Sequence, residues 1–297
     1  MEPVFHIGYH KTATSWLQRS YFRLHPEIML LGNYLAPWDD PFLSYLITSP
    51  HGKYDPIRGA SLVREIAQDS AESDEMRKVL MFSAERLSGH PFSGGFDSFR
   101  IADRIAESFP NAKIVCVVRD QVDMIRSVYK QLISEGYPGT LEQLIDSRSW
   151  KTASFDLGYF EYDRLVSHYF SLFGSGRVCV LRYELLRDDI DEFLKQLCGF
   201  LGIEYMSPEK GSGKVNLSLP DASIALVRRL NYFRTSELYP LPLMDIGKFY
   251  IVFRKLAVRF SRLLKHSMRE NIEEMLDGRY SDSNMRLSQL IDEKGRG

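Results

Sequence analysis

The sequence has no long apolar stretch and few cysteines. None of its apolar runs reaches the roughly 18 residues that cross a bilayer, so we expect no membrane span. Its three cysteines, Cys116, Cys179 and Cys198, are odd in number, lie in apolar stretches and lack the spacing of metal ligands. We therefore expect free thiols in a reducing compartment.

The sequence also has almost no net charge and no leader-like start. Its 38 basic and 39 acidic residues give a formal net charge of −1, which favours no nucleic-acid partner. The chain begins directly with a strand-like run and leaves no room for a signal peptide, so we expect a cytoplasmic protein. Its length of 297 residues suits one large domain, or one domain with an appendage.

The first eighteen residues combine an apolar run with a polar turn. We predict a buried strand from Pro3 to Gly8 and a helix that begins near Thr14. The N-terminus of a helix presents unpaired N–H groups and favours an anion. The turn between them adds a lysine and several hydroxyl groups, and its candidate binding residues are His10, Lys11, Thr12, Ala13, Thr14 and Ser15. This pattern predicts a site for a phosphate or a sulfated phosphate, with an ordinary turn and a surface lysine as the alternative.

The turn is not a nucleotide-binding P-loop. That motif needs glycines at the positions that Phe5 and His10 occupy. The turn instead resembles the phosphosulfate loop of sulfotransferases, Lys-[Ser/Thr]-Gly-Thr-[Thr/Ser] followed by an aromatic or apolar residue and Leu. Here Ala13 replaces the usual glycine in the run Lys11-Thr12-Ala13-Thr14-Ser15-Trp16-Leu17.

A carboxylate follows the next clear strand. Val79 to Phe82 is a continuous apolar run, which is typical of a strand buried on both faces, and Glu85 comes just after it. Open α/β sheets carry their chemistry beyond the carboxyl ends of their strands. The segment from Ser88 to Phe96, which contains His90, is rich in Gly, Ser and Pro and is predicted to be a loop beside that site.

Two later strands also end in polar residues. Arg119 follows the strand Lys113 to Val118, and Ser127 lies in the helix after it. An arginine fork suits phosphate, and sulfotransferases have the same arrangement with the same eight-residue offset. The resemblance therefore implies that Arg119 and Ser127 bind the 3′-phosphate of a donor nucleotide. It likewise implies that Tyr183, after the strand Arg177 to Leu181, contacts the adenine.

Three other segments have less specific patterns. The loop Pro208 to Pro220 stands where sulfotransferases cover the nucleotide, and it offers Lys210 and Lys214 without the family's Arg-Lys-Gly. Residues 32–58 are rich in proline and aromatics, and either fold over their own aromatics or bind an acceptor. Phe249 to His266 forms a basic amphipathic helix, for which packing on the body is favoured over peripheral contact with a membrane through residues 248–266.

The order of these motifs predicts an α/β fold with a central parallel sheet and helices on both faces. We expect the sulfotransferase architecture, similar to P-loop NTPases, in residues 1–220 and a helical C-terminal extension in 221–297 packed on the same domain. The resemblance implies an enzyme that moves a sulfuryl group from PAPS (phosphoadenosine phosphosulfate) to a hydroxyl or amine, with PAP (the desulfated nucleotide) as product and no metal.

The catalytic candidates are Lys11 for charge stabilisation and Glu85 as the general base, with His90 as the alternative base. Carbohydrate, lipid and small phenolic acceptors all remain open, with a carbohydrate or lipid-linked acceptor favoured. The oligomeric state also remains open. The alternative functions are a nucleotide-dependent phosphotransferase of related fold and a non-catalytic nucleotide-binding protein.

Overall fold

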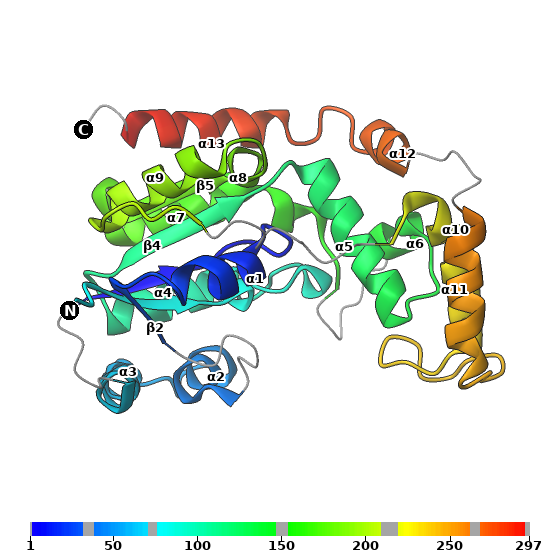
Figure 1. Cartoon of the computed structure of the whole chain (residues 1–297), viewed down its shortest axis with the longest axis horizontal. Helices are drawn as coiled ribbons and strands as arrows, with labels where there is room; N and C mark the ends of the chain where they lie inside the picture. Colours follow the sequence, from blue (N-terminus) through cyan, green and yellow to red (C-terminus); the bar gives the residue numbers. More distant parts are fainter. Residues whose placement is uncertain are drawn as a thin grey trace. The chain divides into compact units, whose positions relative to one another are not determined.

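The computed structural model describes residues 2–31, 39–70, 76–146, 154–208, 219–261 and 268–294. Its contacts separate two compact units (Figure 1). Unit 1 comprises Met1–Arg119, Gly158–Val215 and Ser281–Gly297, and unit 2 comprises Asp120–Leu157 and Asn216–Tyr280. The boundary that the sequence predicts at residue 220 stays a prediction.

Unit 1 contains a five-stranded parallel sheet in the order β2-β3-β1-β4-β5. The strands are β1 (Pro3–His6), β2 (Ile28–Leu31), β3 (Val79–Ser83), β4 (Lys113–Val118) and β5 (Val178–Arg182). Their sequences are nearly continuous apolar runs because helices cover both faces of the sheet (Figure 1). The α/β fold class and the parallel sheet are thus confirmed.

Two apolar layers pack on the sheet. On one face, Phe5 and Phe82 stack at 5.6 Å between ring centroids, and Phe42 and Phe109 pack against them. On the other face, Val4 and residues of β3, β4 and β5 form a cluster with side chains of the first helix and of α9 (Ile190–Leu201), which include Leu17, Tyr21, Phe22, Phe193 and Leu197. The three cysteines are buried free thiols.

The first helix of unit 1 begins at the predicted Thr14. The helices described in this unit are α1 (Thr14–Leu17), the π-helix η1 (Gln18–Phe22), α2 (Pro41–Thr48), α3 (Pro56–Ser70), the short 3₁₀ helices η3 (Glu85–Ser88) and η4 (Pro91–Ser93), α4 (Ser98–Ser108), α7 (Tyr162–Phe173), η6 (Ser175–Arg177), α8 (Tyr183–Asp188), α9 (Ile190–Leu201) and α13 (Ser281–Lys294). Helix α3 starts at Pro56, and proline suits the first turn of a helix. The 3₁₀ helix η5 (Leu157–Phe160) precedes α7.

The described part of the proline-rich segment contains α2 and the first residues of α3. Phe42 of α2 enters the core, and the Tyr45 and Tyr54 rings lie 5.2 Å apart. These contacts favour folding over its own aromatics, while an acceptor-binding role stays a prediction. Residues 32–38 of this segment lie outside the described residues.

Unit 2 is helical in the part that is described. It contains α5 (Gln121–Glu135), α6 (Leu141–Asp146), α10 (Asp221–Leu230), the 3₁₀ helix η7 (Asn231–Phe233), α11 (Phe249–Ser261) and α12 (Met268–Met275). Asp221 at the start of α10 pairs with Arg126 at 2.9 Å and with Lys130, both on α5. The buried Asn231 amide donates to the Ile133 and Tyr137 carbonyls and so joins η7 to the end of α5.

Helix α11 packs on unit 2 through one of its faces. Tyr250, Ala257 and Ser261 are its buried residues, whereas Phe249, Phe253 and Phe260 are exposed. The helix therefore packs through a small and mixed face and turns large apolar side chains outward, while a peripheral contact with a membrane stays a prediction. No helix within the described residues is long and apolar enough to cross a membrane.

A buried polar chain links β1, β3 and the first helix. The Gln18 amide donates to the Ser83 carbonyl oxygen at 2.8 Å and to its hydroxyl oxygen at 3.1 Å. His6 Nδ1 lies 2.7 Å from that hydroxyl, and burial lowers the pKa of His6 to about 3. The Ser83 hydroxyl is therefore hydrogen-bonded to both the Gln18 amide and the His6 ring, and it joins the first helix to β1.

We expect the buried His6 to make the protein less stable in acid. Between pH 6.5 and the folded-state pKa of about 3, the unfolded chain binds a proton at this histidine and the folded chain does not. As the pH falls through this range, the free energy of unfolding should therefore decrease by about 1.4 kcal/mol for each pH unit, from this group alone. Urea unfolding from pH 7 to pH 5 should show a shallower decrease in His6→Gln, whatever its stability at pH 7. Equal slopes in His6→Gln and the original protein would contradict this.

Candidate active site

The turn after β1 has an unusual backbone. Lys11 and Ala13 adopt left-handed conformations, with φ of 65° and 63°. The N–H groups of Trp16 and Leu17 both donate to the Ala13 carbonyl and begin the helix. Between Tyr9 and Trp16, no N–H donates to another backbone carbonyl among the described pairs. Ala13 thus adopts a conformation that glycine takes more easily, at the position where the loop that this turn resembles usually has glycine. The N–H groups of the turn remain available for an anion.

Gly8 allows the turn to pass close to the buried histidine. A Cβ atom at this position would lie 2.9 Å from His6 Nε2, 3.0 Å from Thr14 Oγ1 and 3.1 Å from Thr12 Oγ1. Any larger residue would push these groups apart. Neither Gly8 nor His6 was predicted as a site residue, although a glycine that ends an apolar run is the signal of a close backbone approach.

The hydroxyl groups of the turn have different surroundings. Thr12 is buried and donates to the Tyr9 carbonyl at 2.5 Å, so this hydroxyl stabilises the turn itself. Thr14 is buried and Ser15 is exposed. Of the three predicted hydroxyl donors, only Ser15 is open to solvent.

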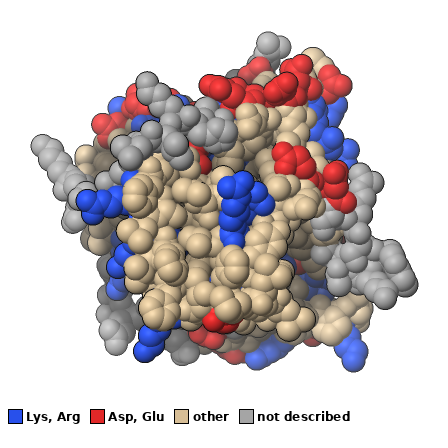
Figure 2. Space-filling model, turned by 90° about the vertical axis from the view of Figure 1, so that its right-hand side faces the viewer, with Lys and Arg blue, Asp and Glu red and all other residues tan. Residues whose placement is uncertain are grey.

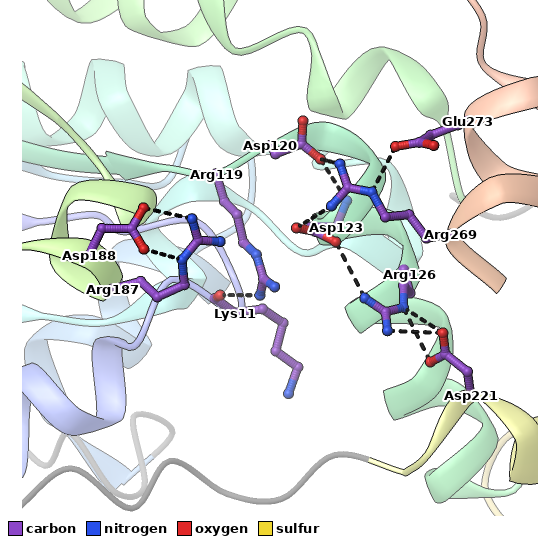
Figure 3. Close-up of polar contacts among 10 residues, drawn as sticks. All are labelled: Lys11, Arg119, Asp120, Asp123, Arg126, Arg187, Asp188, Asp221, Arg269 and Glu273. Carbon is purple, nitrogen blue, oxygen red and sulfur yellow. Dashed lines mark hydrogen bonds and ion pairs between the residues drawn. The ribbon is translucent and has the colours of Figure 1, made fainter. Parts of the chain in front are cut away.

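Arg119 connects the turn to Tyr183. Its guanidinium donates to the Lys11 carbonyl at 3.0 Å (Figure 3). It also lies over the Tyr183 ring, 4.6 Å from the centroid. Its Nε is buried and has no hydrogen-bond partner among the described residues. Three predicted residues from the ends of β1, β4 and β5 are therefore brought together. Figure 3 shows the Lys11 side chain extending away from the guanidinium, with its ammonium clear of the contacts drawn.

The pairing of β1 with β3 places Glu85 beside the turn. His6 is in register with Ser83, and the Ala84 N–H donates to the His6 carbonyl at 3.2 Å. The carboxylate of Glu85 then lies 4.0 Å from His10 Nε2. The side chain of Glu85 remains 30% exposed, so an acceptor could reach it from solvent.

Burial shifts the pKa values of Glu85 and His10 in opposite directions. Burial raises the pKa of Glu85, and the Lys11 ammonium partly offsets this rise. Burial, together with the charges of Lys11 and Arg86 and the nearby His90, lowers the pKa of His10 to about 3. His10 is therefore neutral near pH 7 and can offer a hydrogen bond to a ligand, but no charge.

His90 also lies next to His10. The two rings are 5.2 Å apart and meet edge to face, and burial lowers the pKa of His90. Both candidate bases thus adjoin the same histidine. The preceding segment is fixed by an ion pair between Arg86 and the buried Asp97, which was not predicted as part of the site. The position of Arg86, directly after Glu85, was the available signal.

Two other predicted residues, Ser127 and Lys214, stay predictions as members of this group. Ser127 is half-buried on α5 of unit 2, and its role stays a prediction. Lys214, like Lys210, lies outside the described residues. Within the described residues, no three His, Cys, Asp or Glu side chains are grouped as metal ligands.

One protein-family model matches a part of the chain. Residues 63–207 match the model described as the sulfotransferase family. This segment contains Glu85, His90, Arg119 and Tyr183 but begins after the Lys11 turn. No curated protein matches the chain by sequence.

Comparisons with solved structures concern the fold. A sulfotransferase from Alicyclobacillus acidocaldarius matches with a TM-score of 0.59 and 18% identity, over 98% of this chain and 96% of that chain. A sulfotransferase domain from the curacin biosynthetic pathway has a TM-score of 0.43 and 14% identity, over 93% and 98% of the two chains. Mouse sulfotransferase SULT7A1 complexed with PAP has a TM-score of 0.42 and 15% identity, over 97% and 88%. The family match and the first structure confirm the resemblance to sulfotransferases and their fold.

We expect Arg119→Ala to weaken the binding of PAP by about 2–3 kcal/mol, the scale of a lost charge-assisted hydrogen bond. The variant would also release the Lys11 carbonyl, so the left-handed turn would lose its restraint. Isothermal titration calorimetry measures this loss. Arg177→Ala, at an exposed position elsewhere in unit 1, is the matched control. An unchanged PAP affinity in Arg119→Ala would remove this residue from the site.

Proposed function

We propose that this protein, which carries the sulfotransferase family pattern and fold, transfers a sulfuryl group from PAPS to an acceptor hydroxyl or amine. The observation that carries the proposal is the grouping of Lys11, Arg119, Tyr183 and Glu85 beyond the carboxyl ends of adjacent parallel strands. Parallel α/β sheets bind their ligands at this edge.

The donor nucleotide has a matching set of groups. The open N–H groups of the turn and the Lys11 ammonium suit the phosphosulfate. Arg119 and Ser127 would hold the 3′-phosphate, and Tyr183 would contact the adenine. Ser15, His10 and, from the late loop, Lys214 are further proposed contacts. No step in this scheme requires a metal, since cationic and N–H groups neutralise the phosphates.

The transfer would proceed in line. The acceptor oxygen or nitrogen attacks the sulfur as Glu85 takes its proton, and the bond between sulfur and the phosphate oxygen of PAP breaks. Lys11 and the N–H groups of the turn would stabilise the negative charge that develops on the leaving oxygen. The products are the sulfated acceptor, PAP and a proton on Glu85, which solvent then removes.

The pKa shifts favour Glu85 over His90 as the base. A general base works best with a pKa near the working pH. The surroundings raise the pKa of Glu85 toward neutrality and lower the pKa of His90 away from it. Glu85 therefore becomes a stronger base than an exposed glutamate, while His90 becomes a weaker one than an exposed histidine. His10 would then position Glu85 and the acceptor as a neutral partner.

The acceptor is the least specified part of the proposal. We propose a carbohydrate or a lipid-linked molecule, which would reach the partly exposed Glu85 from solvent. The three buried free thiols fit a reducing compartment such as the cytoplasm.

We expect Glu85→Gln to lower kcat by about 10²–10⁴-fold, the usual share of general-base catalysis. The substitution keeps the shape of the side chain and removes its basicity, so PAP affinity should remain nearly constant. His90→Ala should cost far less. The measurement is sulfuryl transfer from labelled PAPS to acceptors in a cell extract, with product identification.

The pH dependence separates the two bases. Since Glu85 must be deprotonated and burial raises its pKa, kcat should decrease in acid with a midpoint above pH 4.5. This acidic limb should be present in His90→Ala and absent from the residual activity of Glu85→Gln. A large loss of kcat in His90→Ala with a normal rate in Glu85→Gln would reverse the assignment.

We expect PAP to bind in the presence of a chelator and more tightly than ATP with magnesium. The reason is that Lys11 stands without the glycine that a P-loop requires, while Arg119 offers a phosphate contact outside the turn. Calorimetry with PAP, ADP and ATP–magnesium tests this order. Tighter binding of ATP–magnesium would support the alternative of a phosphotransferase, and PAP binding without transfer to any acceptor would support a non-catalytic nucleotide-binding protein.

A further inference from the structure

Unit 2 carries a large apolar surface on α11. Phe249, Phe253, Leu256 and Phe260 repeat at helical spacing, and their side chains are 69%, 46%, 43% and 61% exposed. Val252 on the same helix is 55% exposed. We call these five residues the α11 patch. Exposed apolar groups in such numbers on one helix mark an interaction surface.

The segment before α11 also has exposed apolar side chains. Leu241, Leu243 and Met244 are 83%, 74% and 62% exposed. The Leu243 N–H donates to the Tyr232 carbonyl, and the Ile246 N–H donates to the Phe233 carbonyl. Backbone hydrogen bonds thus hold this segment against η7 with its large side chains turned outward.

Side-chain contacts fix the helix that carries the α11 patch to the rest of unit 2. The Tyr250 hydroxyl donates to the buried Asn231 side chain at 2.6 Å, and the Arg234 guanidinium lies over the Tyr250 ring at 5.0 Å. Asn231 in turn bonds the end of α5. The exposure of the α11 patch is therefore a fixed feature of unit 2.

The charged residues of α11 itself are all positive. The sequence has no acidic residue between Asp245 and Glu270, whereas the same stretch contains Lys248, Arg254, Lys255, Arg259, Arg262, Lys265 and Arg269. Lys248, Lys255 and Arg259 are exposed. Figure 2 shows the side of the molecule on which α11 lies in Figure 1, where a wide uncharged area contains lysine or arginine side chains and has both basic and acidic side chains at its rim.

We propose that the α11 patch docks unit 2 onto an anionic membrane surface, with the helix lying in the interface. Apolar aromatic side chains would enter the boundary of headgroups and acyl chains, and the lysines and arginines would meet the anionic headgroups. A second copy of this chain is a poorer partner, because a symmetric contact would bring the same positive charges together without neutralising them. This inference does not rest on the proposed sulfuryl transfer.

The test is sedimentation with vesicles. The full chain should pellet with phosphatidylserine–phosphatidylcholine vesicles at low salt, bind pure phosphatidylcholine much less, and be released at about 1 M salt, where the Debye length is about 3 Å. The double variant Phe253→Ser, Leu256→Ser should weaken partitioning by at least about tenfold, because two large apolar side chains no longer enter the interface. Its control is Ile57→Ser, at a 76% exposed position in unit 1, which should bind as the original protein does.

A charge-reversal pair tests the electrostatic part. Lys255→Glu with Arg259→Glu should weaken binding to anionic vesicles by roughly tenfold or more, at about 1 kcal/mol for each basic residue near the surface. Lys53→Glu, an exposed lysine in unit 1, is the matched control. No pelleting of the original protein with anionic vesicles at low salt would overturn the proposal, as would unchanged binding of the patch variants. A dimer in analytical ultracentrifugation that Phe253→Ser, Leu256→Ser abolishes, without vesicle binding, would assign the patch to self-association.

Discussion

The parallel pairing of β1 with β3 and β4 is the constraint on which the candidate site depends. It aligns His6 with Ser83 and with Val115, so the three strands end at one edge. The turn that carries Lys11 and the segment that carries Glu85 must then lie side by side. The buried contact between His6 and Ser83 fixes this register from within, because a slip of one residue would separate them and reverse the faces of the strand.

The left-handed turn is the second element that tertiary contacts hold in place. Side chains other than glycine disfavour this conformation by roughly 1–2 kcal/mol per residue. Lys11 and Ala13 nevertheless adopt it. Arg119 helps to stabilise this conformation, because its guanidinium donates a hydrogen bond to the Lys11 carbonyl. The same guanidinium stacks on Tyr183, so a single residue organises both the turn and the predicted nucleotide site. Geometry of this kind prepares the N–H groups before a ligand arrives.

Much of this arrangement could be predicted from the sequence, for a physical reason. Strands covered on both faces are continuous apolar runs, so β3 and β4 and the polar residues that follow them, Glu85 and Arg119, are visible along the chain. His6 and Gln18 could not be assigned in this way, because their importance comes from meeting Ser83 in space. The left-handed turn was hidden as well, since Lys11 and Ala13 are not residues that a sequence pattern assigns to positive φ.

Helix α11 shows where a periodic pattern is insufficient. Its amphipathic sequence defines an apolar face and a basic face but does not say which one the protein covers. The choice follows from Tyr250, whose hydroxyl reaches the buried Asn231, and from the small Ala257 and Ser261, which allow close packing. These contacts orient the helix and leave Phe249, Phe253 and Phe260 outside. A polar anchor on one face has therefore determined the exposure of the apolar residues, and with it the chemistry of the surface that unit 2 presents.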